Sequence, residues 1–371
     1  MKRATLLPIL LALLPAAYLS LWPVPIEPVA WRAPPAPGYV GVHAVNTRLA
    51  HAHQIDLHGE VGPEHVAAGP DGKLYMGVVS GHVLRMDPDG SAQQVLCDTG
   101  GRPLGLAFDA GGRLLVADAV KGLLSVDGDG KVTVLADAVD GAPIRFADGV
   151  IVAPGGKVYF TDASMRFSPG PWGGTLEAAT LDVLEQSATG RVLEYDPLAR
   201  AVREVAHGLS FANGIALSGD GQALYVGESG RYRVWRIAAT ASRLDLAQPS
   251  AQAHVLLDNL PGYPDNLTRG ADGRFWLGLS GPRNALDAMA PWPALRRVML
   301  RLPRALWPTP KPYGHVLAFT EDGAVVADLQ DPGGHSPTTT GVTELAGRAY
   351  IHNLDGRHLD WLALPPPAAP R

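Results

Sequence analysis

Four side chains with oxygen atoms suited to a metal ion stand at one fixed distance from a repeated glycine. Counting back eight residues from each glycine of the repeat gives Glu64, Leu104, Asp148, Asn213, Asp265 and Thr339. Three carboxylates brought together would repel one another and would not all stay ionised unless a cation neutralised them. Oxygen ligands without Cys or His favour a hard cation, so these positions predict a Ca²⁺ site.

Asn266 directly follows Asp265 and is the best additional ligand or supporting group for that ion. The alternative interpretation is that the Asp and Asn residues are ordinary polar turn residues before a strand. Four such residues at one register favour the metal.

The repeat that sets this register is a glycine turn followed by an apolar, β-branched or aromatic run, as in GPDGKLYMG and APGGKVYFTD. Its marker glycines are Gly72, Gly112, Gly156, Gly221, Gly273 and Gly347. A unit of about forty residues made only of strands fits one four-stranded blade, so six units predict an all-β, six-bladed β-propeller. The aligned polar residues would then form a ring around the central axis, just before an innermost strand that follows each glycine.

Helical patterns occur only inside the two largest insertions, at 175–188 and 284–302. The insertions themselves span 165–190 and 282–313. We expect them either at the mouth opposite the ring or over a side that faces a membrane.

Composition excludes several other classes. Glycine (43) and proline (33) are abundant, but no Gly-X-Y period is present and 46% of residues are hydrophobic, which excludes collagen and disorder. The net charge is -5 with no basic run, so nucleic acid is not an expected partner. The single cysteine, Cys97, cannot form an intramolecular disulfide.

The N-terminus resembles a membrane-targeting segment. Lys2 and Arg3 precede an uncharged apolar stretch, residues 4–22, which predicts a single-pass anchor with the propeller on the extracytoplasmic side, periplasmic or luminal. Secretion after signal cleavage is the alternative. A Pro-rich spacer and lead-in at 23–58 is expected to hold the propeller, residues 59–364, off the membrane, and 365–371 form a Pro-rich tail.

Several motifs resemble the strictosidine synthase-like family, whose members include adipocyte plasma membrane-associated proteins. They are RPLGLAFDAGGRLLVADAVKGL, FANGIALS, GESGRYRVWR, LPGYPDNLTRGADGRFWLGL and LQDPGG. The resemblance extends more distantly to paraoxonases and gluconolactonases and implies a six-bladed propeller with calcium in its tunnel. It implies Glu64, Asp148, Asn213 and Asp265 as ligands, with Asn266 as a further one. Asp148 departs from the Asn usual in the family.

Relatives of this architecture include arylesterases and lactonases, so the leading hypothesis is a membrane-anchored, calcium-dependent hydrolase of esters or lactones. Asp265 would accept the proton of the attacking water. His65 and His335 are the possible accessory bases. The catalytic Glu of strictosidine synthase is missing from LGLSGP (277–282), which disfavours alkaloid condensation, and Leu104 replaces the His of paraoxonases.

The alternative function is a non-catalytic propeller, stabilised by calcium, that binds a ligand or partner. Its recognition surface would be the two insertions, with Trp172, Trp292 and Trp307.

Overall fold

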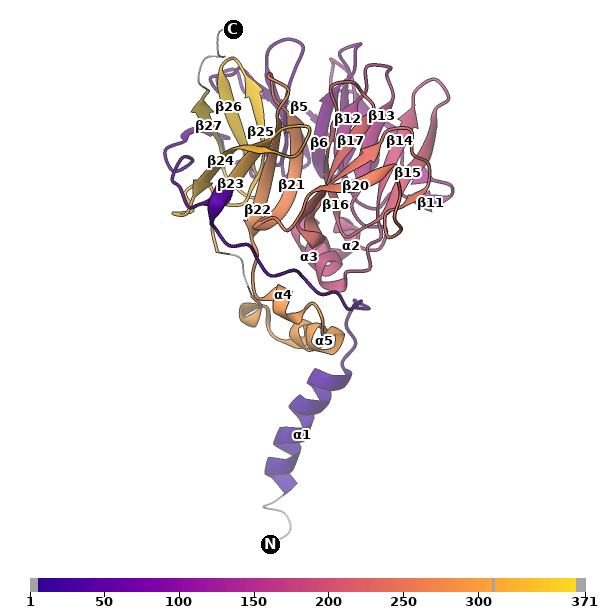
Figure 1. The fold of residues 1–371 in the computed structure, drawn as a ribbon, viewed down its shortest axis with the longest axis vertical. Helices are drawn as coiled ribbons and strands as arrows, with labels where there is room; N and C mark the ends of the chain where they lie inside the picture. Colours follow the sequence, from indigo (N-terminus) through magenta and orange to yellow (C-terminus); the bar gives the residue numbers. More distant parts are fainter. Residues whose placement is uncertain (1–5, 309–310, 365–371) are drawn as a thin grey trace.

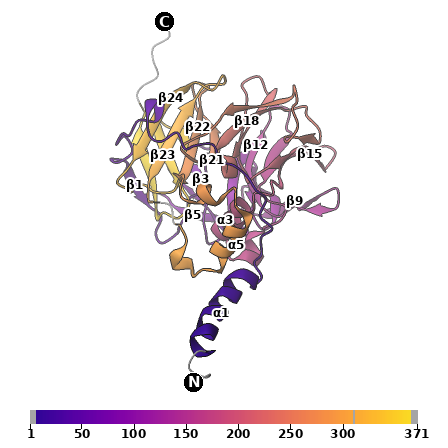
Figure 2. The same cartoon turned by 60° about the horizontal axis from the view of Figure 1, so that its bottom comes forward.

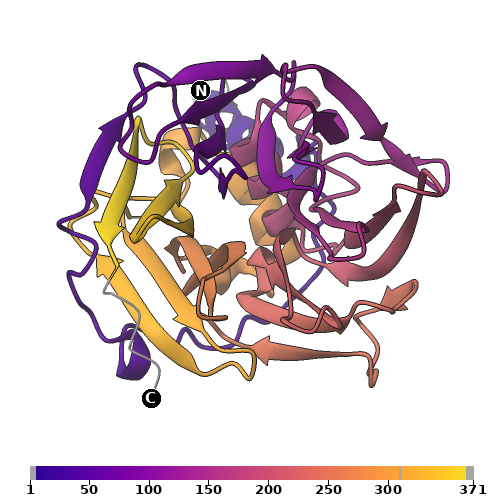
Figure 3. The same ribbon diagram turned by 90° about the horizontal axis from the view of Figure 1, so that it is seen from above.

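Short apolar runs between glycine turns form six sheets arranged around a central axis, antiparallel except for one short edge strand in the third sheet (Figure 3). The structure is a computed structural model that describes residues 6–308 and 311–364. The start of the expected anchor, residues 1–5, and the tail 365–371 lie outside the described residues. The six-bladed β-propeller is confirmed.

Each blade is one sheet, and the sixth is closed by a strand from the N-terminal lead-in. From the innermost strand outward, the first blade contains β2 (Val66–Ala68), β3 (Leu74–Gly77), β4 (His82–Met86) and β5 (Gln94–Asp98), and the second contains β6 (Pro103–Phe108), β7 (Leu114–Asp118), β8 (Gly122–Val126) and β9 (Val132–Ala136). The third contains β12 (Ala147–Val152), β13 (Val158–Asp162), β14 (Gly190–Asp196), β15 (Ala201–Leu209) and β19 (Leu244–Asp245), and the fourth contains β16 (Ala212–Leu217), β17 (Ala223–Glu228), β18 (Arg233–Ala238) and β20 (Ala253–Leu257). The fifth contains β21 (Gly262–Arg269), β22 (Phe275–Pro282), β23 (Gly314–Phe319) and β24 (Val325–Asp331), and the sixth contains β25 (Thr339–Leu345), β26 (Arg348–Asn353), β27 (His358–Ala363) and β1 (His53–Asp56). A small hairpin, β10 (Ala138–Val139) and β11 (Ala142–Pro143), precedes the third blade.

The marker glycines lie in the turn between the first and second strands of each blade. All six have φ between +72° and +86°, a region that glycine adopts without strain. The first strands of neighbouring blades contact one another, so the innermost strand precedes the glycine. The expectation that it follows the glycine was wrong. The second strand carries the longer apolar run because neighbouring blades cover it on both faces, whereas the first strand is interrupted by polar residues.

The hydrophobic core is divided into layers between adjacent blades. One such layer joins Phe160 and Leu193 of the third blade to Leu115 and Leu123 of the second. Every residue of β7 is buried, as expected for a strand covered on both faces.

The described helices gather at one end of the propeller (Figures 1 and 2). The insertion after β13 forms α2 (Pro169–Trp172) and α3 (Thr175–Glu185), and the insertion after β22 forms α4 (Leu286–Met289), α5 (Pro293–Arg301) and η3 (Arg304–Leu306). Two short turns, η1 (Gly41–His43) and η2 (Ser229–Arg231), lie in the lead-in and after β17. The helices expected in the two insertions are therefore present.

The lead-in does not stand free of the propeller. The Val29 amide donates to the Glu185 carbonyl at 2.8 Å, and the Trp31 amide donates to the Ala290 carbonyl at 3.1 Å. The buried guanidinium of Arg296 adds bonds to the Leu184 carbonyl, at 2.6 Å, and to the Val29 carbonyl. These bonds fasten the segment to the insertions, while the expectation that it holds the propeller off a membrane stays a prediction.

The N-terminal helix α1 (Leu6–Leu21) projects from the helical end of the molecule (Figure 1). Arg301 of α5 donates to the carbonyls of Leu19, at 2.8 Å, and Trp22, at 2.6 Å, at the end of α1 where carbonyls lack helical partners. Within residues 6–308 and 311–364, no helix is both long and apolar enough to cross a membrane.

Candidate metal centre and pocket

The ring residues lie at the start of the innermost strands. Glu64 stands just before β2, Asp148 and Asn213 are the second residues of β12 and β16, and Asp265 and Asn266 lie in β21. Except beside Glu64, each ring position coincides with a shift in strand register, such as the one between Ala147 and Val150. A bulge redirects side chains at that point, which turns these polar groups inward.

Glycines beside the ring let the innermost strands approach closely. A Cβ on Gly149 would lie 2.9 Å from the Ile215 amide nitrogen of the next blade, and a Cβ on Gly214 would overlap the Leu267 amide nitrogen. Asp148 and Asn213 are therefore each followed by glycine because the neighbouring backbone occupies the space of a side chain.

Acidic residues at the end of the second strand fix the entry into the innermost strand. Asp162 accepts the Phe146 amide at 2.9 Å, and Glu228 accepts the Ser210 amide at 2.9 Å. Each bond holds the backbone shortly before a ring residue. Asp148 and Asn213 are thus each positioned by a bulge, a glycine contact and a carboxylate in the same blade.

Three ring carboxylates share a buried, acidic environment. Burial raises the pKa of Glu64 despite the Arg102 guanidinium, and burial with the neighbouring Glu64 carboxylate raises the pKa values of Asp148 and Asp265 well above the usual range. The Asn266 side-chain amide donates to Glu64 Oε1 at 2.7 Å, and the Asn266 backbone amide donates to Asp265 Oδ1 at 3.1 Å. Without a cation, these carboxyls therefore hold a proton more readily than isolated ones do.

The donor set of the ring fits a calcium ion. Three buried oxygens have no hydrogen-bond partner, namely Glu64 Oε2, Asp148 Oδ1 and Asn213 Oδ1. Among the described residues, these carboxylates do not form a group whose ligand atoms all lie within 4.8 Å of one another. Calcium binds six to eight oxygen ligands in flexible geometry, and opposite ligands can lie about 5 Å apart, so an all-oxygen set of carboxylates and amides is typical of its sites.

A buried arginine near the ring was not expected from the sequence. Arg102 is 6% exposed, donates to the Gly62 carbonyl at 3.2 Å and interacts electrostatically with Glu64 and Asp148. It lies two residues before Leu104, the apolar ring position of the second blade. Its distance from Gly112 was the only feature of the sequence that could have indicated this position. The other repeats have no arginine at the same distance from their marker glycines, so no pattern predicted it.

The ring forms the floor of a pocket of about 460 Å³. Leu104, Phe146, Phe211 and Tyr263 line its sides, while residues of α3 and Trp307 line its outer part. The insertions therefore cover the same end as the ring, and the prediction that places them opposite it was wrong. The reason is strand direction: β12 pairs antiparallel with β13, so Ala147 beside the ring faces Asp162, where the first insertion begins.

Neither accessory histidine lines this pocket. His65 is buried, accepts the Leu106 amide at 3.3 Å through Nδ1 and packs against His352, and burial lowers its pKa to about 4. The His335 side chain is 73% exposed, with Nδ1 3.4 Å from Asp331 Oδ1. Of the three tryptophans of the insertions, Trp307 lines the pocket and Trp172 and Trp292 do not.

The segment LGLSGP (277–282) contributes the Ser280 hydroxyl to the pocket and contains no acidic residue. Ser280 lines the pocket and forms a hydrogen bond with Asp265 that opposes the rise in the pKa of that carboxyl. Tyr263 also lines it, and burial raises the pKa of its phenol to about 12. Asp265 thus has polar neighbours on the floor while the walls are mostly apolar.

A six-bladed propeller with a buried, oxygen-rich ring under an apolar pocket is the class of protein defined by this geometry. Family comparison matches residues 41–86 to "Strictosidine synthase-like, N-terminal" and residues 148–242 to "Strictosidine synthase". Protein STRICTOSIDINE SYNTHASE-LIKE 7 of Arabidopsis thaliana is 35% identical over 271 residues, which cover 71% of this chain and 67% of that protein. The chain belongs to the strictosidine synthase-like family.

Two further proteins are similar over most of the chain. The adipocyte plasma membrane-associated protein of Homo sapiens is 28% identical over 377 residues, covering 95% of this chain and 86% of that protein. A gluconolactonase from Xanthomonas campestris has the same fold, with a TM-score of 0.60 and 21% identity over 92% of this chain and 97% of that chain.

Proposed function

We propose that this protein is a calcium-dependent hydrolase of esters or lactones. The observation that carries the proposal is the ring of three buried carboxylates and Asn213, with unpartnered oxygens on Glu64, Asp148 and Asn213, at the floor of a pocket of about 460 Å³ with mostly apolar walls. The name of the similar Xanthomonas protein, a gluconolactonase, agrees with this class of reaction.

Glu64, Asp148, Asn213, Asp265 and Asn266 would hold the ion. Bound Ca²⁺ supplies Lewis-acid stabilisation of negative charge on the substrate oxygen. Asn266 keeps Glu64 oriented through bonds to both its carboxylate, at 2.7 Å, and its carbonyl, at 2.9 Å. Arg102 offsets part of the ring charge from the side of the second blade.

Asp265 is the proposed base. It takes a proton from water as the water oxygen bonds to the carbonyl carbon, and it returns that proton to the alcohol oxygen when the ester C–O bond breaks. Ser280 and the Asn266 amide hold the Asp265 carboxyl in place. The sides formed by Phe146, Phe211 and Leu104 exclude water from the acyl or alcohol portion.

The test uses the purified full chain with phenyl acetate and aliphatic lactones, in calcium and after complete metal removal. We expect turnover that depends on calcium and is lost in Asp265→Asn. Asp360→Asn is the matched control, because Asp360 is also a buried carboxyl with a raised pKa but lies on β27 outside the pocket. Turnover that survives removal of all metal would contradict the metal mechanism. If the wild type shows no turnover and both it and Asp265→Asn bind the ligand, the protein is a binding module instead.

We further propose that residues 4–22 attach the protein to a membrane, with the propeller on the extracytoplasmic side. Lys2 and Arg3 before the apolar stretch support this orientation, and Leu13, Leu14, Leu21 and Trp22 of the N-terminal segment are exposed. The name of the similar human protein, adipocyte plasma membrane-associated, agrees. Fractionation of the expressing cells should place the intact chain with membranes, whereas a shortened chain in the soluble secreted fraction would support signal cleavage.

A further inference from the structure

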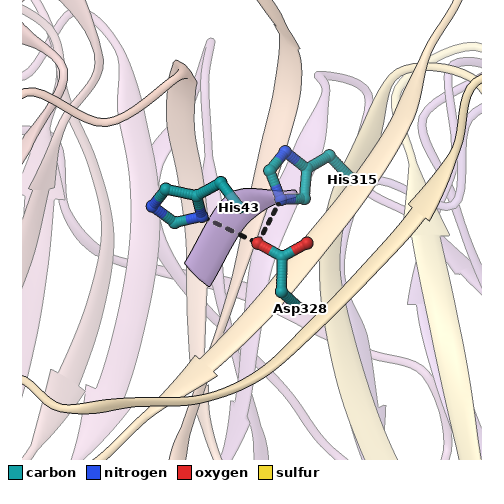
Figure 4. A group of neighbouring side chains, drawn as sticks. All are labelled: His43, His315 and Asp328. Atoms are coloured by element: carbon teal, nitrogen blue, oxygen red, sulfur yellow. Dashed lines mark hydrogen bonds and ion pairs between the residues drawn. The ribbon is translucent and has the colours of Figure 1, made fainter. Parts of the chain in front are cut away.

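A second group of metal-binding side chains lies on the fifth blade. His43 in η1, His315 in β23 and Asp328 in β24 meet although His43 and Asp328 are 285 residues apart in the chain (Figure 4). Among the described residues, this is the one group of three His, Cys, Asp or Glu side chains whose ligand atoms all lie within 4.8 Å of one another. None of the three lines the pocket described above.

Both imidazoles point at the same carboxylate oxygen (Figure 4). His43 Nδ1 lies 2.7 Å and His315 Nε2 lies 2.9 Å from Asp328 Oδ2. His315 is 1% and Asp328 6% exposed, so two of the three groups are out of solvent. The His43 side chain is 13% exposed, which leaves an open side for a water molecule.

The other carboxylate oxygen is used to orient the group. Asp328 Oδ1 accepts bonds from the side-chain amides of Asn46, at 3.3 Å, and Gln330. The Gln330 side chain also donates to the His43 carbonyl at 3.1 Å, which fixes η1 beside β24. Supporting hydrogen bonds of this kind, on the atoms that face away from the metal, are typical of protein metal sites.

The charge of Asp328 lacks a permanent cationic partner. Within residues 6–308 and 311–364, its ion-pair partners are the two histidines, with no Lys or Arg side chain among them. Positive charge can therefore come from a proton on an imidazole or from a metal ion, and buried carboxylates need such compensation.

We propose that His43, His315 and Asp328 form a binding site for Zn²⁺ or a similar divalent transition metal. Two imidazole nitrogens and one carboxylate oxygen are a donor set for such metals and a poor one for calcium. At metal–ligand distances of about 2.0–2.1 Å, tetrahedral ligand atoms lie about 3.3 Å apart, so the present contacts would open by about 0.5 Å. The metal would join the lead-in, which connects the propeller to α1, to the fifth blade.

The experiment measures zinc binding to the metal-stripped full chain by competition with a chromogenic chelator, and the spectrum of Co²⁺ bound in its place. We expect one zinc per chain. His43→Gln should weaken zinc binding by about 100-fold or more, since loss of supporting groups alone costs 10–100-fold. His207→Gln is the control, because His207 contacts Glu204 at 2.8 Å and Asp245 at 4.0 Å without a second imidazole, and it should bind zinc as the wild type does.

Asp265→Asn should keep its zinc, which separates this site from the ring. His43 lies on a short surface turn, so we expect His43→Gln to fold as the wild type does. Circular dichroism of the variant checks this. Asp328→Asn provides an independent variant that should also lose zinc. No stoichiometric zinc on the wild type, or equal zinc affinity in folded His43→Gln and wild type, would overturn the proposal.

Discussion

The central ring and the cluster on the fifth blade both contain buried carboxylates, but the neighbours of those carboxylates differ. In the ring, burial and the Glu64 carboxylate raise the pKa of Asp148, and three oxygens lack a donor. At Asp328, burial also acts to raise the pKa, but hydrogen bonds from His315 and His43 outweigh it and lower the pKa below its usual value. The proposed calcium would neutralise the ring, whereas Asp328 already has two imidazoles that can supply positive charge.

The number of nearby acidic residues does not by itself define a metal site. The ring combines oxygen atoms only, which suits a hard ion such as calcium. The cluster on the fifth blade combines nitrogen and oxygen within 4.8 Å, which suits a smaller ion with affinity for imidazole.

The largest expected effect separates the two regions by activity. Asp265→Asn removes the proposed base and should lower kcat by about 10²- to 10⁴-fold, the usual contribution of general base catalysis. Asp328→Asn, outside the pocket, should leave kcat within about twofold. Initial-rate measurements on phenyl acetate in saturating calcium check this, and equal losses in both variants would break the comparison.

Asp182 is a buried carboxylate that has neither a cationic nor an imidazole ion-pair partner among the described residues. Asp182 of α3 is fully buried, and burial raises its pKa to about 7. The folded state therefore holds a proton that the unfolded chain releases above about pH 4, so stability falls as pH rises from about 4 to 7. Asp182→Asn should be more stable than wild type by up to a few kcal/mol at pH 8 and about equal at pH 4. Urea unfolding at the two pH values measures this, and an equal difference at both would contradict it.

Calcium should stabilise the ring without acting through the cluster on the fifth blade. An ion at 100 times its Kd adds about 2.7 kcal/mol to the free energy of unfolding. Asp148→Ala, which removes the ligand oxygen, should lose most of this gain, while His43→Gln should keep it. Thermal unfolding with and without calcium provides the measurement, and a calcium response that depends on His43 rather than Asp148 would reverse the assignment.

The smallest expected effect concerns the close strand contact beside the ring. A Cβ at Gly214 would overlap the Leu267 backbone, so Gly214→Ala should destabilise by about 1–3 kcal/mol and weaken calcium binding. Gly155→Ala is the control, because nothing lies within 4 Å of a Cβ there. Denaturant midpoints of the two variants compare them; similar midpoints would show that the strand contact is tolerant.

The glycine repeat was sufficient to predict six blades and to align the ring residues. It was sufficient because each marker glycine has the same backbone role, a turn with positive φ between the first two strands. It could not tell which flanking strand is innermost, since both are short and partly apolar. That ambiguity also misplaced the insertions, because strand direction decides at which end they emerge.

The other features depend on contacts between distant segments. Arg102 reaches the ring from a position without a repeat, and His43 joins His315 and Asp328 only after the lead-in folds along β24. The packing of residues 26–31 against the insertions likewise depends on Arg296 and on backbone bonds that no sequence pattern encodes.

Calcium titration of the metal-stripped full chain, followed by activity on the same samples, tests the central claim most directly. We predict one calcium ion bound in the ring, with ester or lactone turnover rising in proportion to occupancy, loss of both in Asp148→Ala, and loss of turnover in Asp265→Asn. Unchanged turnover in the metal-free protein, or calcium binding that is unaffected in Asp148→Ala, would contradict the claim.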